Sequence, residues 1–151
     1  MPTFNSFEEI TAWQKAKILC SKIHSVTITT GLSKDYKLKD QINGSSGSIM
    51  DNIAEGFGRV GNKEFIQFLG ISLGSACECQ SQLHRILDRS YINKILFDEL
   101  YFLCDEIRRM IFGLIKYLQA SITKGLKFKN RETDKTTRMT TPPTLNNKPL
   151  R

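Results

Sequence analysis

The acidic and histidine side chains of this chain are few, and their spacing decides whether it could be an enzyme. Asp51 and Glu55 are four residues apart, so on a helix they would share a face and could in principle serve as acid and base. His24 and His84 each follow a serine by three residues, which is not the Glu-x-x-His spacing of a di-iron bundle site. The local sequence also suggests no Ser–His–Asp or Cys–His arrangement. We therefore expect no catalytic residues and no enzyme activity.

The cysteines do not form a metal or redox motif. Cys77 and Cys79 are separated by a single residue, which is neither the CxxC spacing of redox proteins nor that of a zinc finger. Cys20 and Cys104 lie far from them in the sequence. Thiols buried on helices are the simpler interpretation. We expect no metal site and no cofactor.

Positive charge is concentrated near the C-terminus. Residues 1–123 hold fourteen Lys/Arg against thirteen Asp/Glu, whereas residues 124–151 hold eight against two. Such a basic segment is typical of proteins that contact nucleic-acid phosphates in a sequence-independent, salt-sensitive way. Other basic tails serve only to keep proteins in solution. A smaller basic group, Lys34, Lys37 and Lys39 with Tyr36, lies at one end of the second helix described below. The candidate nucleic-acid-binding residues are Lys124, Lys127, Lys129, Arg131, Lys135 and Arg138.

Apolar residues recur at helical spacing in four stretches, which predicts an all-α protein. We expect helices near residues 6–30, 35–59, 62–89 and 94–124, with Ser6 and Glu9 forming a capping box and Asn62 capping the third helix. Because the connections are short, neighbouring helices should be antiparallel. The predicted fold is an antiparallel, left-handed, up-down-up-down four-helix bundle.

The periodic pattern stops at Gly125. The following Lys, Arg, Thr, Asn and Pro residues cannot bury enough apolar surface to offset the entropy of ordering. We therefore divide the chain into a four-helix bundle, residues 1–124, and a disordered basic tail, residues 125–151.

The second helix contains an unusual run of glycine and serine. An apolar stripe continues through this run at helical spacing from Leu38 to Phe57, so the run is expected to be helical and not a linker. Each glycine costs about 1 kcal/mol relative to alanine, which close packing against another backbone would offset. The predicted close-packing residues are Gly44, Ser45, Gly47 and Ser48, together with Gly74 and Ser75 of the third helix.

Asn52, Glu55 and Arg59 follow at spacings of three and four, so they share one face of the second helix. A solvated surface pair of Glu55 and Arg59 would be worth only a few tenths of a kcal/mol. Beside the small-residue face we favour a second interpretation, a partly buried polar cluster. Its role would be architectural, because it would fix how this helix meets its neighbours.

The same stretch carries a resemblance to a known family. The segment Ser48-Ile49-Met50-Asp51-Asn52-Ile53-Ala54-Glu55-Gly56, followed by Arg59 and Lys63-Glu64-Phe65, resembles the signature of the bacterial four helix bundle protein family. Its founding members are encoded in intervening sequences of the large-subunit ribosomal RNA gene. Trp13-Gln14-Lys15-Ala16 and Gly74-Ser75 match the same pattern, and the resemblance covers residues 4–122. The chain departs from the family at Gly44 to Gly47, where alanine or basic residues are usual.

The resemblance implies both assembly and nucleic-acid binding. Family members form ring-like homopentamers, and a related branch is the accessory protein of diversity-generating retroelements, which binds reverse transcriptase and nucleic acid. By resemblance, this chain would be a homopentamer that associates with RNA or DNA. The alternative is a protein–protein assembly scaffold, for example for a reverse transcriptase, with no direct nucleic-acid role. Apolar residues outside the inner helix faces favour assembly: Leu73, Ile86, Phe97, Phe102, Ile115 and Tyr117.

The sequence also indicates where the protein works. No uncharged apolar run approaches the roughly 18 residues of a membrane span. The N-terminal Met1-Pro2-Thr3-Phe4 lacks the basic and apolar regions of a signal peptide. We expect a cytoplasmic protein with no membrane partner.

Overall fold

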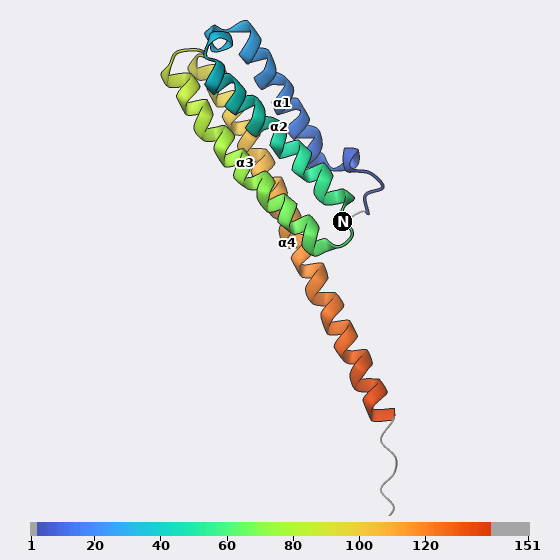
Figure 1. Ribbon diagram of the computed structural model, residues 1–151. Helices are drawn as coiled ribbons and strands as arrows, with labels where there is room; N and C mark the ends of the chain where they lie inside the picture. The colour runs from blue at the N-terminus through green and yellow to red at the C-terminus, as the bar shows by residue number, and fades with distance from the viewer. Residues whose placement is uncertain (1–2, 140–151) are drawn as a thin grey trace, which may run out of the picture.

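The computed structural model describes residues 3–139, and within them the ordered elements are helices. The four α-helices are α1 (Thr11–Thr29), α2 (Tyr36–Gly58), α3 (Asn62–Asp88) and α4 (Lys94–Met139). Two 3₁₀ turns, η1 (Phe7–Glu9) and η2 (Gly31–Lys34), precede α1 and α2. Residues 3–139 contain no strand, and the predicted all-α bundle is confirmed (Figure 1).

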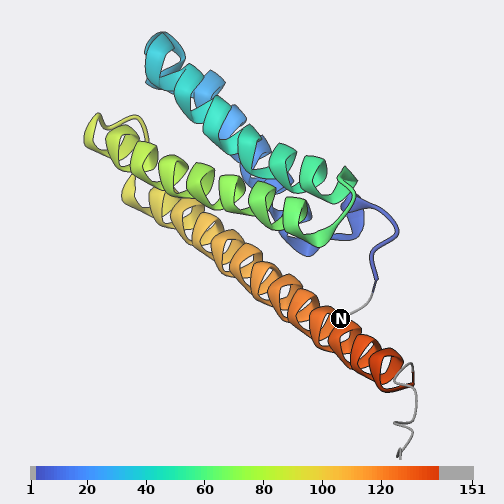
Figure 2. The same ribbon diagram turned by 60° about the horizontal axis from the view of Figure 1, so that its bottom comes forward.

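The helices pack in the order of the chain. Each helix lies against the next one, and α4 also packs against α1, which closes the bundle (Figures 1 and 2). Lys15 of α1 pairs with Glu106 of α4 at 2.9 Å, and Lys22 pairs with Glu99. The residue numbers rise along α1 as they fall along α4, so these two helices are antiparallel.

Aliphatic side chains fill the centre of the bundle. Residues spaced three and four apart lie on one face of a helix, and each fully buried Leu or Ile contributes about 1.5–3 kcal/mol. All four α-helices contribute such buried residues, among them Ala16, Leu19, Ile23, Leu38, Ile42, Ile49, Ile53, Leu69, Ala76, Leu83, Leu100, Ile107 and Ile111.

Some apolar residues expected at the surface belong to the core. Ile86, Phe97 and Ile115 are at most 8% exposed, so the prediction that they add to the apolar surface is wrong. The reason is that α3 and α4 each pack against two neighbours, which covers residues beside the innermost stripe. Phe102 and Tyr117 are exposed, by 63% and 42%.

The first helix begins later than its sequence suggests. The Ser6 side chain makes no capping hydrogen bond, and Glu9 Oε2 instead accepts from the Asn5 N–H at 2.9 Å. Ile10 then takes an extended conformation with its side chain buried, and α1 starts at Thr11. The predicted capping box is therefore absent from the start of this helix. Asn62 likewise lies inside α3, and Gly61, with a φ of 108°, occupies the cap position.

The fourth helix differs most from expectation. Its packed side ends near Ile122, but the helix does not end near Lys124, because it continues to Met139 beyond the other three helices (Figures 1 and 2). Residues 125–139, expected to be disordered, are therefore helical, and residues 140–151 lie outside the described residues. No proline interrupts the chain between Lys94 and Met139, and the packed part of α4 supplies the helical nucleus from which good helix formers propagate.

Candidate functional site

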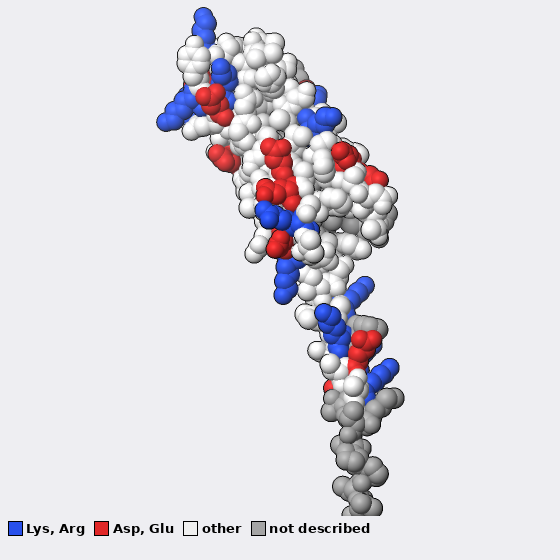
Figure 3. All heavy atoms as spheres, turned by 45° about the vertical axis from the view of Figure 1, so that its right-hand side comes forward, with Lys and Arg blue, Asp and Glu red and all other residues white. Residues whose placement is uncertain are grey.

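The α4 extension, defined here as residues 123–139, carries the candidate nucleic-acid-binding residues on a helix that projects from the bundle. In Figure 3, blue Lys and Arg side chains predominate on this extension, whereas red and blue alternate along the bundle. Arg138 falls within the helix, and its side chain lies outside the description. The exposed basic residues are Lys124, Lys127, Lys129, Arg131 and Lys135.

These five cations form no ion pair with any described residue. The bundle behaves differently, since many of its basic side chains have acidic partners: Lys15, Lys22, Arg59, Arg89, Lys94, Arg108 and Arg109. The positive charge of these five residues is therefore available to bind an anion that is not part of the described chain.

The second basic group lies at the opposite end of the bundle, at the start of α2 (Figure 1). Tyr36 is 68% exposed, and Lys39 Nζ lies 5.0 Å from the centre of its ring. Lys34 and Lys37 are exposed beside it. An exposed ring among cations suits stacking and phosphate contact, but the group is smaller than that of the extension.

The structure divides the predicted polar cluster of α2. Arg59 Nη2 lies 3.0 Å from Glu55 Oε1, and both side chains are about half exposed, at 51% and 52%. Such a pair contributes about 0–1 kcal/mol. Asn52 instead donates to the Ser48 carbonyl at 2.8 Å and to the Ser48 hydroxyl at 2.9 Å. The prediction of one partly buried cluster is thus corrected, and the Arg59 guanidinium approaches α3 at the ring of Phe68, 5.2 Å from the ring centre.

Serine side chains join α2 to α3. Ser45 Oγ donates to Gln82 Oε1 at 2.6 Å, and the hydroxyl oxygens of Ser48 and Ser75 are 2.9 Å apart. Gln82 Nε2 donates in turn to Glu78 Oε1 at 3.1 Å. The three predicted serines therefore lie where the two helices approach closely.

The predicted glycines do not share this contact. A Cβ added at Gly44, Gly47 or Gly74 would meet no neighbouring atom within 4 Å, so the expectation of close packing at these positions is corrected. Gly56 is the glycine at a close approach, because a Cβ there would lie 2.6 Å from Phe68 Cβ. The periodic pattern identified the helix but not which of its glycines faces α3.

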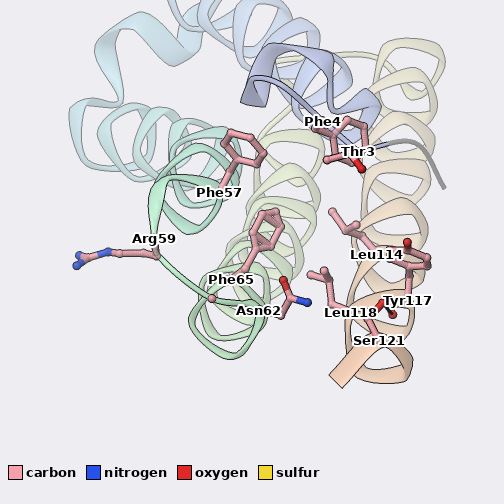
Figure 4. A pocket seen from close by; sticks show the side chains of 11 residues that line it. Thr3, Phe4, Phe57, Arg59, Asn62, Phe65, Leu114, Tyr117, Leu118 and Ser121 are labelled. Carbon is pink, nitrogen blue, oxygen red and sulfur yellow. Dashed lines mark hydrogen bonds between the residues drawn. The ribbon is translucent and has the colours of Figure 1, made fainter. Parts of the chain in front are cut away.

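A cavity of about 290 Å³ lies where the N-terminal segment, the α2–α3 turn and α4 meet (Figure 4). Phe57 and Phe65 stand edge to face on one side, with ring centres 6.2 Å apart, and Arg59 extends away from the cavity. No carboxylate, histidine or thiol is among the described residues that line it. The lining consists of Thr3, Phe4, Phe57, Arg59, Gly61, Asn62, Phe65, Leu114, Tyr117, Leu118 and Ser121. The sequence did not predict this cavity. The only sign of it in the sequence is that phenylalanine recurs among the residues that line it.

Cys79 and Cys104 are buried in the core, whereas Cys20 is partly buried and Cys77 is exposed. Cys104 Sγ donates to the Ala76 carbonyl at 3.3 Å. The hydrogen bond with Cys104, together with burial, raises the pKa of Cys79 well above its usual value. Within residues 3–139, no three His, Cys, Asp or Glu side chains come together in a way that could hold a metal ion. None of the helices in this range is both long enough and apolar enough to cross a membrane.

Comparisons with known proteins agree with the fold. A family model described as "23S rRNA-intervening sequence protein" matches residues 8–113. A crystal structure of a protein of unknown function from the S23 ribosomal protein family of Bacteroides thetaiotaomicron is similar, with a TM-score of 0.65 and 24% identity. The similarity covers 70% of this chain and 95% of that one. No curated protein matches the chain. The family match ends at residue 113, so the α4 extension lies outside it.

Proposed function

The chain belongs to the 23S rRNA-intervening sequence protein family, and we propose that it is a non-enzymatic, self-associating accessory protein that binds RNA through the α4 extension. The observation that carries this proposal is that Lys124, Lys127, Lys129, Arg131 and Lys135 pair with no described residue, beside a bundle in which many cations are paired. The absence of acid–base groups around the described cavity favours binding over catalysis.

Phosphate contact explains why such charge would be useful. Each cation that neutralises a phosphate releases a counterion, so affinity falls steeply as salt rises. Residues 123–139 hold six Lys/Arg against two Asp/Glu. Engaging about six phosphates would give a log–log salt slope near −4 to −5. Self-association, as a pentamer in our proposal, would bring several extensions to one RNA and raise their effective concentration.

The test compares three forms of the protein: the full chain, a chain ending at Met139 and a chain ending at Lys124. Binding to a generic RNA is measured by fluorescence anisotropy at about 50 mM and about 200 mM salt. The form ending at Met139 keeps the extension and should retain most of the affinity. The form ending at Lys124 should bind at least about tenfold more weakly at low salt and with a shallower slope. Its bundle should unfold as before, because every described side chain that is removed is exposed. Equal affinities of all three forms would exclude the extension as the RNA contact.

A second candidate function is protein assembly without RNA. Ile18 of α1 and Phe102 of α4 are 49% and 63% exposed. Along the two helices they lie between the Lys15–Glu106 and Lys22–Glu99 ion pairs, so apolar surface is framed by charges as at many protein interfaces. In this reading the chain is a scaffold for another protein, for example a reverse transcriptase. The absence of salt-dependent RNA binding by the full chain would favour it.

A further inference from the structure

Four cations of the α4 extension form one stripe. Lys124, Lys127, Arg131 and Lys135 follow one another at spacings of three, four and four. At 3.6 residues per turn, these positions fall within roughly 80° of the helix circumference. Lys129 lies on nearly the opposite side of the same helix. Arg138, three residues after Lys135, continues the register of the stripe.

The stripe residues repel one another in the free protein. Like charges three or four residues apart on a helix are destabilising, by about as much as opposite charges are stabilising. Glu132 and Asp134 flank the stripe, but neither forms an ion pair with a described residue. No described acidic residue neutralises the stripe, so a row of negative charges on a bound ligand would reduce the repulsion among its cations.

The spacing of the stripe suits a nucleic-acid backbone that is itself regular. With a rise of 1.5 Å per residue, the four cations span roughly 16 Å and recur about once per turn. A duplex holds its phosphates in a regular row, whereas a single strand does not. Proteins that hold single strands rely largely on aromatic side chains on which bases stack. Residues 123–139 contain a single aromatic residue, Phe128, which is too few for the row of stacked bases that such proteins hold.

We propose that Lys124, Lys127, Arg131 and Lys135 lie along the phosphate backbone of a nucleic-acid duplex, while Lys129 faces away from it. This inference rests on the proposed function and specifies the class of nucleic acid that the extension binds. The contact is with phosphates, which RNA and DNA duplexes share. Because the family match ends at residue 113, the stripe would add a duplex-binding arm to the family's bundle.

The test uses two matched variants of the full chain, Lys127→Gln and Lys129→Gln. They remove the same charge two residues apart, and glutamine is as good a helix former as lysine. Each variant is titrated against a mixed-sequence RNA duplex, a DNA duplex of the same sequence and one RNA strand at equal phosphate concentration. Lys127→Gln should weaken duplex binding several-fold and reduce the salt slope by about 0.9, whereas Lys129→Gln should change affinity less than about twofold.

A triple variant, K127Q/R131Q/K135Q, should lose at least about tenfold in duplex affinity and about 2.7 in salt slope, with unchanged helical content by circular dichroism. The RNA and DNA duplexes should bind alike, and both more tightly than the single strand. Equal losses of duplex affinity in Lys127→Gln and Lys129→Gln would contradict the proposed duplex contact, and so would a single strand bound as tightly as a duplex. Neither result would contradict the proposed RNA binding. A strong preference for the RNA duplex over the DNA duplex would also contradict the proposed duplex contact, because 2′-hydroxyl contacts would then be needed. No binding to any of the three would remove the proposed function as well.

Discussion

The hydroxyl of Tyr91 donates a hydrogen bond to Asp35 Oδ2 at 3.0 Å, which ties the α3–α4 connection to the start of α2. Arg89 pairs with the same oxygen, and Asp35 Oδ1 accepts from the Leu38 N–H at 3.4 Å as the N-cap of α2. Partial burial raises the pKa of Asp35, but the hydrogen bonds from Arg89, Tyr91 and Leu38 outweigh it and hold the pKa below its usual value. The hydrogen bond with Asp35 in turn raises the pKa of Tyr91.

The first prediction concerns acid stability. A carboxylate whose pKa is lower in the folded state contributes stability above its unfolded pKa, about 3.9, and loses it as pH falls further. Asp35→Asn keeps an N-cap but removes the charge. The variant should be less stable than the parent at pH 7, and the difference should shrink below about pH 4. Urea unfolding across the pH range checks this, with Asp51→Asn, a change at an exposed aspartate of α2, as control. A difference that stays constant into strong acid would contradict the prediction.

The second prediction distinguishes the glycines of α2 and α3. Gly56→Ala would place a Cβ 2.6 Å from Phe68 Cβ, an atom next to the backbone of α3, so the two helices must move apart. We expect it to destabilise the fold by about 1–3 kcal/mol. Gly44→Ala and Gly74→Ala enter open space and should stabilise by up to about 1 kcal/mol through helix propensity. Chemical unfolding of all three variants measures the contrast, and a gain from Gly56→Ala would show that α2 and α3 separate easily.

The third prediction concerns the hydrogen bond between Ser45 and Gln82, which are both 4% exposed. Ser45→Ala removes the hydroxyl that donates to Gln82 Oε1, and a buried polar atom left without a partner costs about 1–3 kcal/mol. Replacing Gln82 with leucine in the same chain should recover part of that loss. The unfolding free energies of the two single variants and the double variant form a double-mutant cycle that measures the interaction of Ser45 with Gln82. Ser81→Ala, on the exposed side of α3, is the control. Additive losses would mean that the two side chains do not interact.

The buried faces were predictable because the periodicity of large aliphatic residues survives a run of small ones. Leu38, Ile42, Ile49 and Ile53 are fully buried on either side of that run. Helical spacing alone does not show which small residues face a neighbour. That depends on the rotation of α2 against α3, which places Gly56 at the contact and leaves Gly44 open.

The candidate site was predictable by residue type but not by conformation. The loss of apolar periodicity after Gly125 correctly marks where packing ends, since the side chains from 123 to 127 are exposed. It does not mark the end of the helix, because a helix that has already nucleated propagates through residues such as Lys127 and Arg131. The stripe exists only in the helical conformation, so no argument that assumed disorder could have found it.

The last prediction concerns self-association. Phe102 is 63% exposed on α4, and along the helix it lies between Glu99 and Glu106, the residues that pair with α1. Phe102→Gln should leave the stability of the bundle nearly unchanged, because most of this side chain is already in water. If the α1–α4 face joins copies of the chain, the variant should have a lower mass in sedimentation equilibrium at concentrations where the parent is assembled. Tyr36→Gln, which changes a ring 68% exposed at the end of the bundle, provides a control of matched chemistry and should keep the parent's mass. If the assembly kept its mass in Phe102→Gln but lost mass in Tyr36→Gln, the interface would lie at the end of the bundle where α2 begins and not on the α1–α4 face.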